Sequence, residues 1–445
     1  MFKQMSVVVA LLTLADAGRA AARELTATPG NVRQQVAALQ AGDTLELQPG
    51  TYQGGIKLSR LRGRADAPII VRGHGKDTVV LGKSGTNSMD LVDCQWVVVR
   101  DLKFDGQGKE VDAIKAGQEP RGCHHITIEN NMIINHGANQ QIVGISTKSP
   151  CSDWIIRGNT VLGAGTGLYL GNSDGRQPFV RGIVEYNLVS NPVGYCMQIK
   201  HQKPRPANDL LPTQPSTTII RYNVFIKGDG PSPDGNRPNL LVGGFPETGP
   251  GSEDRYQIYG NVLFHNPRES LFQGTGRISV HDNVFIDVPG TAITVTKHDG
   301  LVPRQVFVYH NTFLGVGRAW SISGGPKELV TAANLSLADQ GAANLWPAGN
   351  VRLTAAEAAQ SVLDPSPQLG KADVQPRQPI AAVIEANALR LIEQDADHDR
   401  DFWGRARERL QQAGACQTAL QPRPIKAEIR VLAPAAGGGQ QTAAK

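Results

Sequence analysis

The sequence predicts an all-β solenoid, because one short pattern recurs along most of its 445 residues. Each copy is a short apolar run, an asparagine, a second apolar pair and a glycine-containing turn. A period of 22 to 38 residues, rich in β-branched residues and without helical periodicity, is typical of stacked coils. The copies are ITIENNMII (126–134), WIIRGNTVL (154–162), GIVEYNLVS (182–190), IIRYNVFI (219–226), QIYGNVLF (257–264), ISVHDNVFI (278–286) and VFVYHNTFL (306–314).

An asparagine anchors each copy. Asparagine tolerates the left-handed conformations of tight turns. Stacked asparagines can also hydrogen-bond along the solenoid axis and satisfy polar groups that the turn would bury. We therefore expect the anchors to be structural. They are Asn131, Asn159, Asn187, Asn223, Asn261, Asn283 and Asn311, spaced 28, 28, 36, 38, 22 and 28 residues apart.

The sequence predicts four segments, of which the solenoid is one. Residues 1–22 combine a basic residue, the apolar stretch SVVVALLTLADA and small residues, and predict a secretory signal peptide. Residues 23–365 form the solenoid, and a helix over 31–43 caps its first coil. Residues 366–420 form a partly helical C-terminal cap. The Pro-, Ala- and Gly-rich residues 421–445 predict a disordered tail.

Composition narrows the classes of function. The net charge is only +5 and no basic tract occurs, so nothing points to nucleic acid, while an anionic partner remains possible. No apolar run beyond the N-terminus reaches the length of a membrane span. We expect a monomeric periplasmic or secreted protein.

Three cysteines precede successive strands at spacings of 29 and 28 residues: Cys94, Cys123 and Cys151. They should stack in one column on coils about 4.8 Å apart. Two alternatives stay open: one pair is oxidised, or all three are buried thiols that fill a corner.

Two intervals of the repeat are longer than the others. The extra residues lie in HQKPRPANDLLPTQPS (201–216) and in the segment 227–255. Loops inserted at one corner of adjacent coils rise on the same side and wall a groove. The strand between them, YCMQIKHQ, should line its floor.

The exposed ends of the strands next to these loops predict a polar strip. Strand alternation places Gln198 and Lys200 outside. Lys200 lies 13 residues after its anchor and Asn172 lies 13 after the preceding one, so the two should be neighbours to within about one residue. Lys148 comes one coil earlier, and His201 follows Lys200 directly.

The coil phrases, together with GDTLELQPGTYQGGIKL (42–58) and APIIVRGHGKDTVVLGKSG (67–85), resemble the right-handed parallel β-helix superfamily. This superfamily includes pectate-lyase-like polysaccharide lyases, uronan epimerases and related glycosidases. DFWGRARERLQQAGAC (401–416) is similar to the final turn of many of its members. The resemblance covers most of residues 40–416 and implies the fold, which hosts several chemistries.

The resemblance favours cleavage of a uronic-acid-containing polysaccharide by β-elimination. Lyases of this superfamily commonly use a basic side chain as the base, and GYCMQIK (194–200) is similar to the strand that carries the catalytic lysine in some of them. Lys200 is then the base and His201 an accessory acid or orienting group. Gln198 stands where an acidic residue would be expected. We therefore predict no metal ligands, and Ca²⁺ is possible but is not supported by an acidic cluster. The predicted binders of substrate carboxylates are Asn172, Gln198, Lys148, Arg205 and Lys297.

Two alternatives to a lyase remain. A non-catalytic solenoid that binds glycans or handles exopolysaccharide would need the same cations but no base. An epimerase or glycoside hydrolase would need clustered carboxylates, and the coil strands hold no Asp-Asp pair. Such carboxylates would have to come from the 227–255 loop, namely Asp229, Asp234, Glu247, Glu253 and Asp254.

Overall fold

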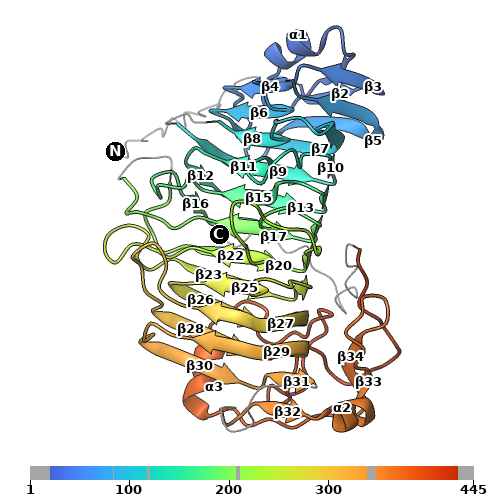
Figure 1. The fold of residues 1–445 in the computed structure, drawn as a ribbon. Helices are drawn as coiled ribbons and strands as arrows, with labels where there is room; N and C mark the ends of the chain where they lie inside the picture. Colours follow the sequence, from blue (N-terminus) through green and yellow to red (C-terminus); the bar gives the residue numbers. More distant parts are fainter. Residues whose placement is uncertain (1–20, 84, 118–120, 207–210, 338–346, 429–445) are drawn as a thin grey trace, which may run out of the picture.

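The computed structural model describes residues 21–83, 85–117, 121–206, 211–337 and 347–428. Strands β1 to β32 form one continuous array of parallel ladders wound into stacked coils (Figure 1). The predicted parallel β-helix is confirmed. The predicted signal peptide lies almost entirely outside the described residues. Within them, no helix has the length and apolar character needed to cross a membrane.

The pairing of the strands divides each coil among three sheets. The first sheet contains the strands that precede the anchor asparagines. Its strands are β1 (Glu24–Ala27), β2 (Thr44–Leu47), β5 (Ile69–Leu81), β7 (Gln95–Asp105), β9 (Cys123–Glu129), β13 (Ile155–Arg157), β17 (Ile183–Glu185), β20 (Thr217–Arg221), β23 (Arg255–Tyr259), β26 (Arg277–His281), β28 (Gln305–Tyr309) and β30 (Glu328–Ala332), with the short strands β12 (Cys151–Ser152) and β16 (Phe179–Val180) at its edge.

The second sheet contains the strands that follow the anchors, and four long strands run through a corner into a neighbouring sheet. Its strands are the ends of β5 and β7, then β3 (Gly50–Gln53), β10 (Met132–Ile134), β14 (Thr160–Leu162), β18 (Leu188–Ser190), β21 (Val224–Ile226), β24 (Val262–Phe264), β27 (Val284–Val295), β29 (Thr312–Ile322), β31 (Leu335–Leu337) and β32 (Val351–Leu353).

The third sheet closes each coil. Its strands are β4 (Ile56–Ser59), β6 (Met89–Val92), β8 (Ile114–Ala116), β11 (Val143–Thr147), β15 (Thr166–Leu170), β19 (Met197–Ile199), β22 (Leu240–Val242), β25 (Phe272–Gly274) and the ends of β27 and β29.

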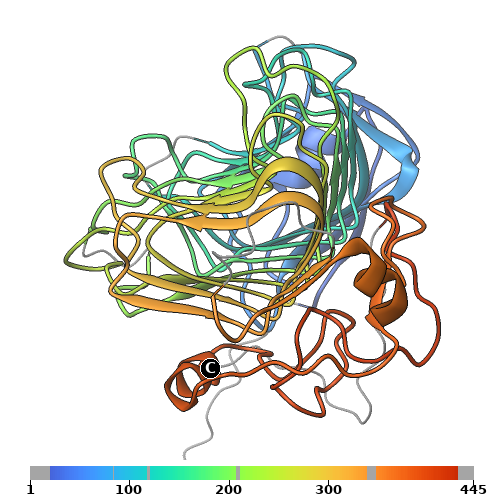
Figure 2. The ribbon, with the colours of Figure 1, turned by 60° about the horizontal axis from the view of Figure 1, so that its bottom comes forward.

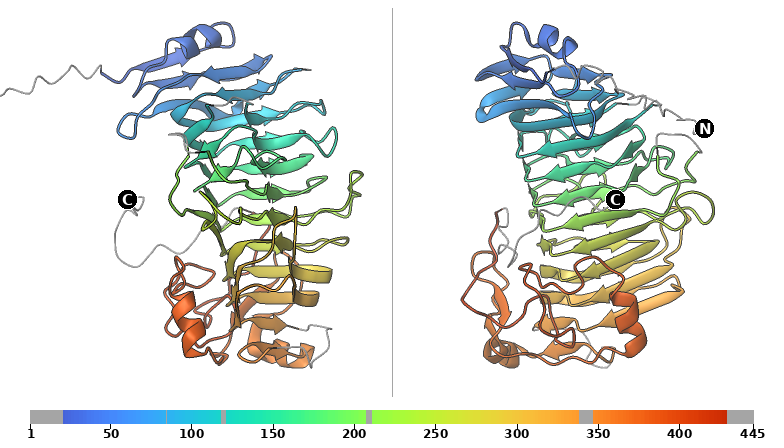
Figure 3. Two further views of the ribbon diagram at one scale, coloured as in Figure 1. Left: turned by 90° about the vertical axis from the view of Figure 1, so that its left-hand side faces the viewer. Right: turned by 180° about the vertical axis from the view of Figure 1, so that it is seen from behind.

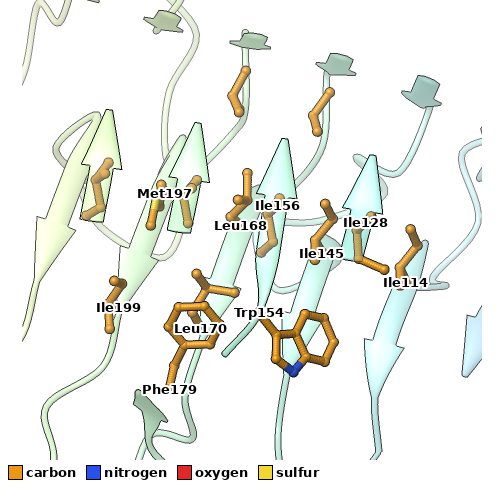
Figure 4. Close-up of a cluster of buried hydrophobic side chains, with 14 of the residues drawn as sticks. Ile114, Ile128, Ile145, Trp154, Ile156, Leu168, Leu170, Phe179, Met197 and Ile199 are labelled. Carbon is orange, nitrogen blue, oxygen red and sulfur yellow. The ribbon is translucent and has the colours of Figure 1, made fainter. Parts of the chain in front are cut away.

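Every second side chain of a strand points into the coil and stacks on its equivalent in the next coil. Figure 4 shows such stacks from the first and third sheets, with Ile114, Ile145 and Leu168 in successive coils. These side chains have no exposed surface. A stack of fully buried branched side chains supplies the hydrophobic stabilisation of the solenoid, at roughly 1.5–3 kcal/mol for each side chain.

The anchor asparagines form a hydrogen-bonded ladder, as predicted. The side-chain amide and backbone N–H of Asn131 both donate to Oδ1 of Asn159, each at 3.1 Å, and the same pair of bonds recurs from coil to coil. The ladder extends beyond the predicted anchors to Asn334 and Asn350. The left-handed residue of the turn is the one before the anchor, for example Tyr186.

The cysteine column is present as a stack of buried thiols. Cys123 and Cys151 are register partners, and all three predicted members are free and buried. The structure thus corresponds to the second of the two alternatives.

At the N-terminal end, helix α1 (Val32–Ala37) is shorter than the predicted 31–43 and buries Val32 and Val36 against the first coils. After the last coil, the chain folds back along the outside of the solenoid through α2 (Ala355–Ser361), the antiparallel pair β33 (Val362–Asp364) and β34 (Asp373–Pro376), and α3 (Ala386–Ile392) (Figures 2 and 3). Ile425, within the segment assigned to the tail, is buried there, and residues 429–445 lie outside the described residues.

The back-folded segment 355–428 is fixed by ion pairs and hydrogen bonds to the first sheet as well as by apolar packing on the second. Asp395 pairs with Arg255 on β23 and accepts a hydrogen bond from the Tyr309 hydroxyl on β28 at 3.0 Å. Arg407 pairs with Asp282, and both are buried. The segment 355–428 therefore covers the outer faces of the first and second sheets over the later coils.

We expect Asn223→Ala to lower the free energy of unfolding by about 3 kcal/mol, because it removes the acceptor of two buried donors on Asn187 and a donor to Asn261. Urea unfolding followed by circular dichroism measures the change. Thr51→Ala on the exposed face of β3 is the control and should cost under about 0.5 kcal/mol. Equal stability of the two variants would contradict a structural ladder.

Candidate functional site

The outer face of the third sheet carries a row of polar residues fixed by strand register. Lys115 of β8, Ser146 of β11, Tyr169 of β15 and Gln198 of β19 are register partners in that order. Their neighbours along each strand point into the core, so alternation forces these four outward. The row therefore crosses four successive coils.

A groove of about 430 Å³ lies over this row and is lined mainly by polar groups. Four cations reach it from different coils: one lies in β8, two directly follow β11 and β19, and one lies in the segment 227–239 before β22. The predicted 227–255 loop is thus divided by β22. Its first part enters the third sheet at the end opposite to the one from which residues 201–216 leave, so the expectation that both insertions rise at one corner is wrong. The residues that define its character are Lys115, Lys148, Lys200, Arg237, Tyr169 and Tyr195. A groove with four cations is suited to a polyanion.

Lys148 follows β11 and lines the groove. Its Nζ atom is 3.3 Å from the centre of the Tyr169 ring. Burial lowers the pKa of Lys148 to about 8, the neighbouring cations Lys115 and Lys200 act in the same direction, and Asp112 opposes them. A lysine with this pKa is partly neutral at physiological pH and can accept a proton.

Lys115 is held beside Lys148 by an acidic partner. Its Nζ lies 3.0 Å from Oδ2 of Asp112, whose other oxygen accepts a hydrogen bond from the backbone N–H of Val143 at 2.8 Å. Asp112 is therefore fixed by the strand of the next coil and positions the ammonium group of Lys115 in the groove.

Lys200 lies where the spacing placed it, at the end of β19 in the groove, and Gln198 lines the floor. The neighbour of Lys200 on the preceding coil is Gly171, which is one residue from the predicted Asn172. The amide of Asn172 instead bonds to Gln177 at 2.9 Å within its own turn. The structure thus brings Lys148, Gln198 and Lys200 together but leaves Asn172 outside the groove lining.

His201 points away from this groove, toward the turn after β27. Its Nδ1 lies 2.9 Å from Oδ2 of Asp299, and Nδ1 of His298 lies at the same distance from that oxygen. Although burial acts to raise it, the pKa of Asp299 is lowered by His298, His201 and Lys200. Lys297 of the same turn is exposed and does not line the groove.

Arg205 is buried in an ion pair and does not face the groove. Its guanidinium has no exposed surface and pairs with Asp254, with Nη2 3.1 Å from Oδ1. Burial raises the pKa of Asp254, and Arg205 acts against that rise. This pair fixes the two inserted loops to each other and leaves Arg205 no surface for a ligand.

The carboxylates of the 227–255 loop do not converge. Asp229 contacts His265, Asp234 accepts from Gln141, Glu253 pairs with Arg277 and Glu247 is exposed. Among the residues that the structure describes, no three His, Cys, Asp or Glu side chains are placed to hold a metal ion.

Sequence reasoning missed several groove residues. Tyr169 could have been found, because alternation in GLYLG places it outward beside Lys148. Tyr195 and Arg237 have no such signal, since both reach the groove from irregular segments.

No family model matches the chain, and no curated protein matches it. Among solved structures, it is similar to an alginate lyase from Paenibacillus sp. str. FPU-7, with 17% identity, a TM-score of 0.37, and coverage of 68% of this chain and 98% of that chain. The A-module of mannuronan C-5 epimerase AlgE4 from Azotobacter vinelandii is 15% identical, with a TM-score of 0.40 and coverage of 73% and 90%.

A pectate lyase, Pel9A, is 14% identical, with a TM-score of 0.43 and coverage of 82% of this chain and 93% of that chain. At such identities and scores no reaction is transferred from these proteins. The assignment of the fold rests on the strand pairing within this chain.

Arg205→Met is expected to destabilise the protein by about 3–5 kcal/mol, because it leaves the buried Asp254 without its partner. The loss should grow as pH rises, since a carboxyl with a raised folded-state pKa favours the folded state only while protonated. Urea unfolding at pH 5 and pH 8 measures both effects. Unchanged stability would show instead that the pair of Arg205 and Asp254 does not hold the two segments together.

Proposed function

We propose that the protein is an exported polysaccharide lyase that cleaves a uronic-acid-containing polysaccharide by β-elimination. The observation that carries the proposal is the place of Lys148, which is half-buried over the Tyr169 ring in a groove with three further cations, surroundings that lower its pKa to about 8. A groove that only bound a polyanion would gain from fully charged lysines. A lowered pKa is instead what a proton acceptor requires.

The reaction assigns distinct tasks to the groove residues. Lys115 and Lys200 neutralise the C6 carboxylate of a bound uronate, which makes the C5 proton acidic. Neutral Lys148 removes that proton, the electron pair forms the C4–C5 double bond, and the C4–O4 bond breaks. The leaving oxygen takes a proton from an acid in the groove.

Tyr169 is suited to be that acid. It lies directly under Lys148, and burial raises the pKa of its hydroxyl, with Ser173 acting in the opposite direction. Tyr169 therefore keeps its proton at neutral pH and can donate it to the departing oxygen. After one turnover Lys148 holds the C5 proton and Tyr169 lacks one, so transfer between the two restores the site.

Lys200 remains a second candidate base, as the sequence analysis predicts, with His201 as an orienting group. In the geometry described here Lys200 acts on Lys148 through its charge and lowers the pKa of Lys148. Gln198, at the floor of the groove, would bind the sugar, and Asn172 and Lys297 are assigned no role in the reaction.

The rival functions predict different products. A lyase makes unsaturated chain ends that absorb in the ultraviolet, an epimerase and a hydrolase make none, and a non-catalytic solenoid binds without product. Polygalacturonate, alginate and chondroitin cover the main classes of acidic polysaccharide. Binding without product on any of them would support the non-catalytic solenoid.

On the polymer that is cleaved, Lys148→Met should lower kcat by at least about a thousandfold, because it removes the base. Lys200→Met should lower kcat much less, because Lys115 still neutralises the carboxylate, and should also raise KM. Initial rates from ultraviolet absorbance measure both, with Lys76→Met on an exposed bulge of β5 as the control. The reverse order of the two effects on kcat would make Lys200 the base.

The rate should also depend on pH in a defined direction. Below the Lys148 pKa of about 8, the fraction of Lys148 that is neutral increases about tenfold for each unit by which the pH rises. The value of kcat/KM should therefore rise up to about pH 8 and then level off. Initial rates at constant ionic strength from pH 6 to 9.5 test this. In Lys200→Met, the midpoint should move to higher pH, since one cation beside Lys148 is lost. A rate that falls from pH 6 upward would exclude a lysine base.

A further inference from the structure

The loop 227–239, which connects β21 to β22, places one cation over the groove. Arg237 is half-buried, and its guanidinium carbon is 5.5 Å from the centre of the Tyr195 ring. Nη2 donates to the backbone carbonyl of Asp234 at 2.7 Å, and Nη1 donates to that of Asn236 at 3.0 Å. The orientation of the guanidinium is thus set by the loop's own backbone.

Gln140 fixes the loop to the solenoid on one side. Its Oε1 accepts from the backbone N–H of Asp234 at 3.0 Å, and its Nε2 donates to the carbonyl of Gly235 at 3.2 Å. Gln140 is 5% exposed, so its side chain is held in place by the solenoid while it bonds to the exposed loop. Gln141 adds a bond from Nε2 to the Asp234 carboxylate at 2.8 Å.

Asn266 fixes the loop on the other side. Its Nδ2 donates to the backbone carbonyl of Arg237 at 3.0 Å, and its Oδ1 accepts from the backbone N–H groups of Arg268 and Glu269. Asn266 is also buried. Two buried amide side chains, from Gln140 and Asn266, therefore hold the loop on both sides of the Arg237 guanidinium.

Gly235 has a geometric role in this arrangement. It has φ of +102°, and a Cβ atom there would lie 2.9 Å from Nη1 of Arg237. Any other residue would be strained and would displace the guanidinium.

Within the described residues Arg237 forms no ion pair, and its two hydrogen bonds use two of five N–H donors. Tyr195 precedes β19, whereas Tyr169, under Lys148, belongs to β15 of the preceding coil. Adjacent coils are about 4.8 Å apart. Tyr195 is level with Thr166, three residues before Tyr169 along the strand, so Arg237 lies on the opposite side of the groove from Lys148, at roughly 3.3 Å per residue, as well as one coil further on. A cation at that separation faces a different sugar from the one that lies at Lys148.

We propose that Arg237 determines specificity by binding the carboxylate of a sugar beyond the one that reacts, so that the substrate is a chain with uronates at more than one position. This inference rests on the proposed function. A planar guanidinium with free donors matches a carboxylate in a way that a lysine ammonium does not. Gln140 and Asn266 are positioning residues that act through the loop.

Arg237→Gln should weaken binding of the cleaved polymer by at least about tenfold and raise KM similarly, with kcat within about threefold of the parent. Arg237→Lys should recover only part of the loss. Gln140→Met keeps Arg237 in the sequence but removes the two hydrogen bonds that hold its loop. This variant should raise KM, while the midpoint of thermal unfolding shifts little. Arg318→Gln, on the exposed part of β29, is the matched control and should change none of these values.

Binding is measured by affinity electrophoresis in gels that contain polygalacturonate or alginate, so it does not depend on turnover. If the parent binds but cleaves nothing, the proposed lyase is wrong while the role of Arg237 is still tested. Unchanged binding in Arg237→Gln, or an equal loss in Arg318→Gln, would overturn the inference. A loss confined to kcat in Arg237→Gln would also overturn it, since it would make Arg237 part of the reaction centre.

Discussion

The asparagine ladder is the interaction on which the rest of the structure depends. Each amide bonds to the coil on either side at close to 3 Å, and the bonds across the two longest intervals are as short as the others. Because buried amides cannot exchange these bonds for water, a slip of one residue in any coil would leave donors unsatisfied. The ladder thereby fixes the register of the strands on either side of each anchor, in the first and second sheets, and on this stack the third sheet pairs its own strands and sets the row of side chains that makes the groove.

Insertions at a corner do not disturb this register, so the loops are free to supply chemistry. The regular strands contribute lysines and a tyrosine from positions set by alternation, and the inserted loop contributes an arginine from the opposite wall. The closeness of these groups gives Lys148 its lowered pKa, since burial and two neighbouring cations act in the same direction. The lowered pKa of Lys148 thus depends on several coils, which together bury it and bring other cations beside it.

Much of this could be predicted from the sequence, and the limits are physical. The repeat predicted the coils and the ladder, and alternation placed Gln198 and Lys200 outward, because strand geometry is local. Asn172 lies one residue from the expected row, and Arg205 binds Asp254, because turn geometry and burial depend on the whole structure. Arg237 left no signal, since its position depends on Gln140, which lies about a hundred residues earlier and contacts the loop only after folding.

The back-folded C-terminal segment changes how the solenoid should come apart. In a linear stack each coil contacts only its neighbours, and the ends can fray one coil at a time. Here Asp395 bonds to strands of different coils, and Arg407 adds a buried ion pair to Asp282 on a third. The later coils are thus joined through this segment as well as through their own ladders. Their unfolding becomes a single cooperative event in which the segment must detach first. A chain whose repeats are nearly independent thereby acquires the cooperativity of a globular domain at the end where no further coil protects it.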